Sequence, residues 1–289
     1  MARHHVVRTR KGLRYASPDL LLDLYIPDIP APAGVPVVLY LHGGAWLIGS
    51  REDHLDRLVR LAEHGIAVAS ADYRFANAAA FPAQLHDAQA AVRWLRREGQ
   101  AHGLATERIG VWGASAGAHI AAHLALAVDG PESSVQAMVG YFGSYDLTAR
   151  AADARPDPAL PVPHEVRTAV WPTGLPHPPS ARLRHALLAG VPEAELTEDH
   201  FRALSPVTHV HSESPPMMLL HGTGDAITSA QQSRWLAEAV RAAGGQARTL
   251  LLDGANHEDP VFDEHETIAA VAEFFTGHLR GSEMNRTST

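Results

Sequence analysis

Short apolar runs alternate with longer amphipathic stretches through most of this chain. The run Val35–Leu41 is apolar at almost every position, which is typical of a strand buried on both faces of a parallel sheet. After Pro82, residues such as Leu85, Ala88 and Val92 recur at helical spacing, which predicts an amphipathic helix over residues 82–102. The apolar runs therefore predict strands, and the amphipathic stretches predict helices.

Extended along the chain, this pattern predicts strands at residues 20–26, 35–41, 66–71, 109–112, 135–142, 216–220 and 247–252. It predicts helices at residues 53–64, 82–102, 119–126, 228–243 and 263–279. Repeated strand–helix alternation is typical of the α/β class, in which helices flank a mostly parallel central sheet.

The alternation is interrupted between residues 149 and 201, where proline is frequent and only short helical pieces are expected. An unstructured segment of this length is unusual in a compact domain, so we predict a cap-like insertion over the sheet. The main domain is expected at residues 20–280, with tails at 1–19 and 281–289. The basic residues of the first tail, from Arg3 to Arg14, predict a solvated and partly ordered segment.

Composition excludes several classes of protein. The net charge is −8, from 24 basic and 32 acidic residues, which disfavours a nucleic-acid partner. With no cysteine, the chain has no thiol nucleophile and no Cys-type zinc site. Its single lysine, Lys11, lies in the predicted tail, so neither a P-loop nor a pyridoxal Schiff base is expected.

Nineteen histidines raise the question of a metal site. The nearest clusters are His209-Val210-His211 and the stretch from His257 to His265, and neither has the spacing of H-E-x-x-H. We therefore expect no metal and no other cofactor. The chain shows neither the apolar core of a signal peptide nor a membrane-length apolar stretch, so we expect a cytoplasmic protein with no membrane span. Whether it is a monomer or a homo-oligomer stays open.

One serine stands in a motif with a chemical meaning. The strand at residues 109–112 leads into Gly113-Ala114-Ser115-Ala116-Gly117, and an alanine-rich helix follows. A strand that turns sharply into a helix strains the turn residue, and small neighbours two positions before and after the serine relieve the crowding. The helix N-terminus then favours negative charge that develops near the serine oxygen. Ser115 is therefore the predicted nucleophile.

A serine hydroxyl needs a base to accept its proton and an acid to orient that base. Asp225 and His257 both follow predicted strands, at the sheet edge where open α/β sheets bind their ligands. We predict Asp225 as the acid and His257 as the base. Asp146, one strand earlier, is an alternative acid, and Asp253 is a weaker one because it lies on the same loop as His257.

An oxyanion formed at the nucleophile needs preorganised N–H donors. Ala116, directly after the serine, should supply one, and the glycines Gly43 and Gly44 after the strand Val35–Leu41 should supply others. Aromatic residues near these positions and in the insertion are candidate walls of the substrate pocket: Trp46, Tyr141, Phe142, Trp171 and Phe201, together with Leu175.

Seven motifs now stand in order along the chain: HGGAW (42–46), DYR (72–74), FPAQL (81–85), GASAG (113–117), YDLT (145–148), SPV (205–207) and HGTGD (221–225). Together they resemble the α/β-hydrolase superfamily, and more narrowly its hormone-sensitive-lipase-like and feruloyl-esterase-like carboxylesterases, over roughly residues 20–280. The resemblance implies the α/β-hydrolase fold and the serine–acid–histidine order of Ser115, Asp225 and His257. It also implies Gly43, Gly44 and Ala116 as oxyanion donors, with Asp72 and Arg74 supporting the oxyanion loop.

The sequence therefore predicts a cofactor-free serine hydrolase that cleaves small carboxylic esters through an acyl-enzyme intermediate. Two alternatives remain. One is an amide or peptide hydrolase, such as a formamidase or a prolyl-oligopeptidase-like peptidase. The other is a non-catalytic binder of small molecules on a hydrolase scaffold. The acyl and alcohol groups of the substrate are not specified by these motifs.

Overall fold

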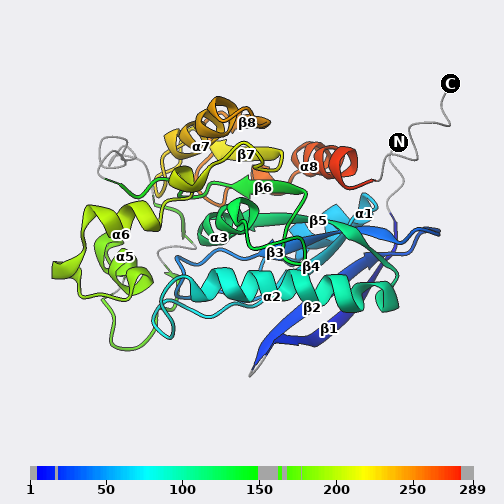
Figure 1. Ribbon diagram of the computed structural model, residues 1–289, viewed down its shortest axis with the longest axis horizontal. Helices are drawn as coiled ribbons and strands as arrows, with labels where there is room; N and C mark the ends of the chain where they lie inside the picture. Colours follow the sequence, from blue (N-terminus) through cyan, green and yellow to red (C-terminus); the bar gives the residue numbers. More distant parts are fainter. Residues whose placement is uncertain (1–4, 17–18, 149–161, 165–167, 177, 281–289) are drawn as a thin grey trace.

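A twisted sheet of eight strands forms the centre of the molecule (Figure 1). The computed structural model describes residues 5–16, 19–148, 162–164, 168–176 and 178–280. The strand order is β1-β2-β4-β3-β5-β6-β7-β8, and every pair from β4 to β8 is parallel. Only β1 and β2 run antiparallel to their neighbours. The predicted α/β class with a mostly parallel sheet is confirmed.

The strands are β1 (Val7–Ala16), β2 (Leu20–Pro27), β3 (Val35–Leu41), β4 (Ala67–Ala71), β5 (Leu104–Ala114), β6 (Ala137–Tyr141), β7 (Met217–Gly222) and β8 (Ala247–Leu252). Most of them agree with the predicted apolar runs to within a few residues. The central strands are buried along nearly their whole length, as expected for a parallel sheet covered on both faces.

Helices cover both faces of the sheet (Figure 1). On one face lie α2 (Ala83–Glu98), α3 (Ala116–Leu126) and α7 (Gln231–Ala242), and on the other lie α1 (Leu55–Glu63) and α8 (His265–Leu279). The 3-10 turn η1 (Gly99–His102) extends α2 to the end of its predicted helix.

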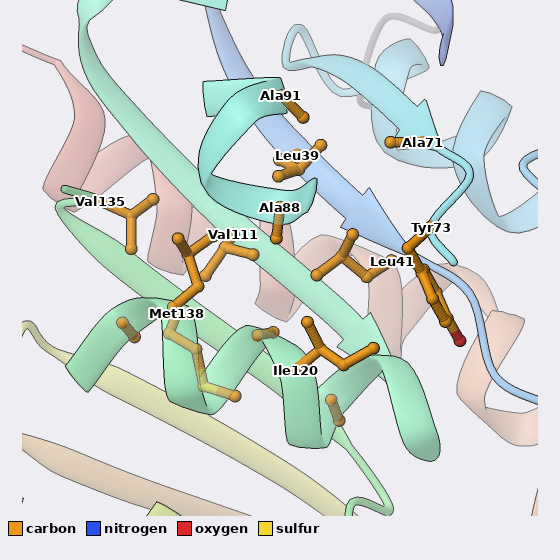
Figure 2. Close-up of a cluster of buried hydrophobic side chains, with 14 of the residues drawn as sticks. Leu39, Leu41, Ala71, Tyr73, Ala88, Ala91, Val111, Ile120, Val135 and Met138 are labelled. Carbon is orange, nitrogen blue, oxygen red and sulfur yellow. The ribbon is translucent and has the colours of Figure 1, made fainter. Parts of the chain in front are cut away.

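Strand β3 shows how the sheet separates two hydrophobic cores. Val37, Leu39 and Leu41 belong to the cluster that includes α2, α3 and α7, whereas Val38 and Tyr40 belong to the cluster under α1 and α8. Successive side chains of a strand point to opposite faces, so one apolar run supplies both cores. Figure 2 shows the first cluster, where side chains from β3 and β5 meet those of α2 and α3.

Part of the predicted insertion forms a small helical unit at one end of the molecule (Figure 1). It contains α5 (Ala181–Ala189), the 3-10 turn η3 (Glu193–Glu195) and α6 (Glu198–Ala203). Two further 3-10 turns are η4 (Pro206–His209) and η5 (Pro260–Asp263). Residues 149–161 and 165–167 of the predicted insertion lie outside the described residues.

The N-terminal segment differs from its prediction as a tail. Residues Val7–Ala16 form β1, which pairs antiparallel with β2 at the edge of the sheet. Most of its side chains are exposed, so the segment lacks the apolar run by which the inner strands were recognised. Its place in the sheet depends on backbone pairing and on Tyr15, which is buried and donates its hydroxyl to the carbonyl of Asp72. An edge strand needs only one partner, so a polar sequence can form it.

Strand β5 also begins five residues earlier than the predicted 109–112 segment, at Leu104. Leu104 is buried and pairs with Val35 of β3, but the exposed Glu107 and Arg108 separate it from the apolar run. In the part of the chain that the structure describes, no helix has the length and apolar character needed to cross a membrane.

Candidate active site

Ser115 occupies the sharp turn between β5 and α3. Its backbone has φ 51° and ψ −116°, a strained conformation for a non-glycine residue. A Cβ at Gly113 would lie 2.3 Å from the carbonyl oxygen of Gly117, and a Cβ at Gly117 would lie 2.0 Å from that of Leu41. Both distances are far shorter than any real carbon–oxygen contact. The two glycines are therefore required for the crowded turn that the motif predicted.

Three side chains from separate loops form one hydrogen-bonded chain. Nε2 of His257 lies 3.0 Å from Oγ of Ser115, and Nδ1 of the same ring lies 2.8 Å from Oδ2 of Asp225. Asp225 follows β7 and His257 follows β8, so both loops leave the same edge of the sheet as the serine turn. The structure thus brings together the three residues that the sequence predicted as nucleophile, base and acid.

Asp225 is held as a buried carboxylate. Its Oδ1 accepts the backbone N–H groups of Ile227 and Thr228, both at 2.8 Å, and its Oδ2 faces His257. Burial by itself would raise the pKa of Asp225, but the charge of His257 and hydrogen bonds from His221 and His257 outweigh burial and lower that pKa well below its usual range. Asp225 is therefore ionised at neutral pH and can stabilise a positive charge on His257.

His221 is a second histidine on this carboxylate, and the sequence analysis did not identify it. Its Nε2 lies 3.2 Å from Oδ2 of Asp225 and 2.8 Å from the carbonyl of Thr228, and its Nδ1 lies 2.8 Å from the hydroxyl of Ser233. Both neighbours of Nε2 are hydrogen-bond acceptors, so Nε2 is the donor in these contacts. The sequence signals were its position at the end of an apolar strand and its place as the first residue of the HGTGD motif, four residues before Asp225.

His257 is 4% exposed and packs against the ring of Phe142, with 4.6 Å between the ring centroids. Burial lowers the pKa of His257. The charge of Asp225 and the hydrogen bond to it raise this pKa by a larger amount, so the net shift is upward. Such an imidazole is a stronger base than an exposed histidine and is still largely neutral above its pKa.

The two alternative acids lie elsewhere. Asp146 is buried, and its Oδ1 accepts both the backbone N–H and the hydroxyl of Thr148. Its backbone also exchanges hydrogen bonds with the side chain of Gln232 from α7. Asp253 accepts a hydrogen bond from the hydroxyl of Thr223. His257 therefore has its carboxylate contact with Asp225, and Asp146 orders the loop after β6.

The loop after β3 passes beside the serine. A Cβ built on Gly43 would lie 3.5 Å from Cβ of Ser115, which shows how closely the Gly43 backbone approaches the nucleophile. Gly44 has φ +116°, and a Cβ there would lie 2.1 Å from the carbonyl oxygen of Ile48. Ala116 is the first residue of α3, where N–H groups have no carbonyl partner within the helix. All three residues predicted as oxyanion donors border one cavity with Ser115 and His257.

Polar contacts from the segment after β4 support this loop. The Tyr73 hydroxyl donates to the carbonyl of His42 at 2.9 Å, and its ring stacks on the His42 ring with 4.4 Å between centroids. Asp72 accepts from both the backbone and the guanidinium of Arg51. Arg74 pairs instead with Asp87 of α2. The Asp72-Tyr73-Arg74 motif therefore acts through backbone and ion-pair contacts around the loop.

Trp46, at the end of the same loop, is tied to the serine helix and to the insertion. Its indole N–H donates to Nδ1 of His119 at 3.2 Å, and Nε2 of His119 lies 2.7 Å from the carbonyl of Leu204, just after α6. Burial lowers the pKa of His119 to about 4, so this ring is neutral at physiological pH and can accept the indole proton. One neutral histidine therefore joins the loop, α3 and the end of α6.

Glu258 and Arg57 anchor the loop that carries His257, and the sequence analysis did not identify either. Arg57 of α1 is 1% exposed, donates to Glu258 at 3.1 Å and also pairs with Asp263. Burial raises the pKa of Glu258. Electrostatic interactions with His54 and Arg57 lower this pKa by a larger amount, so the net shift is downward. The ion pair holds the residue after His257 against the helix below the loop.

A cavity of about 1480 Å³ opens above Ser115. Trp46, Trp171 and Phe201, three of the residues predicted as pocket walls, border it. Tyr141 and Phe142 do not border it, and their prediction as substrate-binding residues is corrected. Both are fully buried in the core under α1 and α8: Tyr141 lies on the same face of β6 as Ala137 and Val139, and Phe142, with φ 38°, follows it into this core. Leu175 packs against the larger core instead.

Metal ligands do not converge in this site. Within the described residues, no group of three or more histidine or acidic side chains could hold a metal ion. His209 instead lies 3.0 Å from the carbonyl of Ala203, and His211 lies 3.3 Å from that of Leu126.

Comparison with known proteins identifies the family. The model of the BD-FAE family matches residues 22–240, and the chain belongs to this family. Similar curated proteins include the esterases LipQ and LipC of Mycobacterium tuberculosis (strain ATCC 25618 / H37Rv). LipQ is 31% identical over 91% of this chain, and LipC is 31% identical over 90% of it. The chain spans 60% of the length of LipQ and 62% of that of LipC.

Solved structures share the fold. A truncated carbohydrate esterase from gut microbiota superimposes with a TM-score of 0.76 at 22% identity, covering 96% of this chain and 98% of the other. A thermophilic esterase of Thermogutta terrifontis, solved with bound propionate, superimposes with a TM-score of 0.68 at 23% identity, covering 95% of this chain and 94% of the other. This chain therefore has the α/β-hydrolase fold, as its motifs implied.

Proposed function

We propose that this protein is a serine esterase that hydrolyses carboxylic esters through an acyl-enzyme intermediate. The observation that carries the proposal is the hydrogen-bonded chain from Ser115 through His257 to Asp225 at the floor of a large cavity. A hydroxyl, a base and an orienting carboxylate in this arrangement can activate a nucleophile at neutral pH. The esterase names of the similar proteins LipQ and LipC agree with this chemistry.

In the first half-reaction, Nε2 of His257 accepts the Ser115 proton while Oγ attacks the ester carbonyl. Ionised Asp225 holds Nδ1 protonated and stabilises the resulting imidazolium. The carbonyl oxygen becomes an oxyanion, for which the N–H groups of Gly43, Gly44 and Ala116 are the proposed donors. Collapse of the tetrahedral intermediate breaks the bond to the alcohol, and His257 returns the proton to the departing alkoxide.

In the second half-reaction, His257 takes a proton from a water molecule that attacks the acyl-serine carbonyl. The same N–H groups stabilise the second oxyanion, whose collapse breaks the bond between the acyl carbon and Oγ and releases the carboxylic acid, while His257 returns its proton to Oγ of Ser115. The net reaction consumes one ester and one water molecule and gives one acid and one alcohol.

A panel of aryl and alkyl esters, with matched amides, tests this function on the purified protein. We expect hydrolysis of esters and loss of at least about a thousandfold in kcat/KM for Ser115→Ala. A fluorophosphonate probe should label the wild type at the peptide that contains Ser115. Ser134→Ala, at a half-buried position that does not border the cavity, serves as the matched control. Ester turnover that survives Ser115→Ala, or a preference for the amides, would contradict the proposal.

A further inference from the structure

Arg184 borders the cavity above Ser115 but has no acidic partner. It lies in the middle of α5, and its Nη1 donates to the carbonyl of Pro179 at 2.8 Å. Its Nε is buried and lacks any hydrogen-bond acceptor. Among the described residues, no carboxylate forms an ion pair with it. A guanidinium offers five N–H donors, so most of this group's capacity is unused by the protein.

Among the described residues, the other sheltered arginines have more hydrogen-bond acceptors than Arg184. Arg57 pairs with two carboxylates, and Arg51 pairs with Asp23 and Asp72. Arg96 lacks a carboxylate and its Nε is also buried without an acceptor, but its Nη atoms donate to the carbonyls of Thr106, Glu107 and Ser134. Arg184, with one carbonyl acceptor, is therefore the poorly compensated cation of this group, and it is the one that borders the cavity.

An under-satisfied cation in a sheltered position is costly for the free protein. Burial lowers the pKa of Arg184, which means that its charged form loses hydration without a compensating partner. An incoming anion would restore the missing interactions. Arginine pairs especially well with carboxylates, because its planar group can donate two parallel hydrogen bonds to the two oxygens.

The position of Arg184 relates it to the reacting groups. Burial lowers the pKa of His257, and Asp225 raises it by a larger amount. The positive charge of Arg184 also acts to lower this pKa. The charge of Arg184 therefore reaches the base across the shared cavity. The neighbouring His185 cannot supply a second cation at neutral pH, because burial lowers its pKa to about 3.

From this placement we infer that Arg184 binds a carboxylate carried by the substrate, so that the enzyme prefers esters bearing a second, anionic group. The inference rests on the proposed esterase function and specifies its substrate class. Two aromatic side chains that also border the cavity, Trp171 and Phe201, would contact the carbon skeleton between the ester and the carboxylate. Arg184 would thus act in substrate recognition, with no part in proton transfer.

Two pairs of substrates test this inference and distinguish the acyl from the alcohol side. Mono-p-nitrophenyl glutarate and p-nitrophenyl pentanoate differ in an acyl-side carboxylate, and p-acetoxybenzoate and p-acetoxybenzamide differ in an alcohol-side carboxylate. In at least one pair, wild type should show the higher kcat/KM for the anion. In Arg184→Gln, the ratio of anionic to neutral kcat/KM should fall about tenfold or more, mainly through KM.

Two further variants control for general effects. Arg202→Gln removes an exposed arginine of α6 that does not border the cavity, and it should leave the ratio at its wild-type value. Arg184→Lys keeps the charge but loses the planar pair of donors, so its ratio should lie between those of wild type and Arg184→Gln. If Arg184→Gln does not fold, competition in wild type replaces it: glutaramate should inhibit hydrolysis of the neutral ester more strongly than glutaramide.

A binding measurement separates this inference from the esterase proposal. Calorimetry with the Ser115→Ala variant should detect mono-p-nitrophenyl glutarate, and adding Arg184→Gln should weaken that binding about tenfold or more. If Arg184→Gln changes kcat/KM equally for the anionic and the neutral ester of each pair, and binding of mono-p-nitrophenyl glutarate is unchanged, the carboxylate site is overturned. The proposed esterase function is not affected by that result. Arg184-dependent binding without turnover of any ester would support the site and contradict the esterase.

Discussion

Oγ of Ser115 and Nε2 of His257 lie 3.0 Å apart, although 142 residues separate them in the chain. The contact joins the turn after β5 to the loop after β8, with two strands between them in the sheet. It can form only because parallel strands end at one edge, where their loops converge. The chemistry of the proposed active site therefore depends on sheet order and on two loops held in place by buried contacts.

The identity of the acid can be tested by comparing two substitutions. Asp225→Asn removes the charge that orients His257 and stabilises its imidazolium, so kcat should fall about a thousand- to ten-thousandfold with KM little changed. Asp146→Asn changes a residue whose carboxylate binds Thr148, and it should cost much less in rate. Steady-state kinetics on one ester compares the two, and the reverse order would assign the acid to the loop after β6.

The pH profile should reflect the raised pKa of His257. His257 must be neutral to accept the Ser115 proton, so kcat/KM falls as pH decreases through its pKa. Because the net shift is upward from 6.5, the acidic limb should lie above the ordinary histidine value. Asp225→Asn removes the charge that raises this pKa, so the limb of its residual activity should move to lower pH. A limb that stays in place in this variant would contradict the assigned cause.

His221 should influence the reaction through Asp225. His221→Phe removes one hydrogen bond to the carboxylate and leaves the Ser233 hydroxyl without its partner. We expect kcat to fall about tenfold, the loss of one hydrogen bond to a charged group. The acidic limb of kcat/KM should also shift, because the electrostatics of the Asp225–His257 pair change. Ser233→Ala, which removes only the outer contact, should have a smaller effect on both, and equal effects would place His221 in packing alone.

The two tight glycines of the serine turn should not tolerate alanine. In Gly117→Ala the new Cβ would meet the Leu41 and His42 carbonyl oxygens at 2.0 and 2.4 Å, so the backbone must shift. We expect the free energy of unfolding to fall by about 3 kcal/mol or more, with loss of activity. Gly277→Ala is the matched control, because it lies in α8 with no atom within 4 Å of the new Cβ. It should raise stability by about 1 kcal/mol in thermal or denaturant unfolding.

Local pattern was sufficient to predict most of the fold. Runs such as Val35–Leu41 are apolar because parallel strands are buried on both faces, so the strand is visible without knowledge of its neighbours. The serine turn was equally visible, because its geometry requires glycine at positions 113 and 117 whatever surrounds them. Positions at the ends of strands also predicted Asp225 and His257 as candidates, since that edge follows from the alternation itself.

Tertiary structure decided what depends on neighbours distant in the chain. Asp225 and Asp146 both follow strands, and only the loop conformations bring Asp225 to His257. Tyr141 and Phe142 were predicted to line the pocket, but the structure places both side chains in the core under α1 and α8. The face on which a side chain at a strand end lies depends on the strand's position in the sheet. Sequence alone determines short-range geometry and burial, whereas side-chain partners such as those of His221 and Arg184 come from the packing of separate elements.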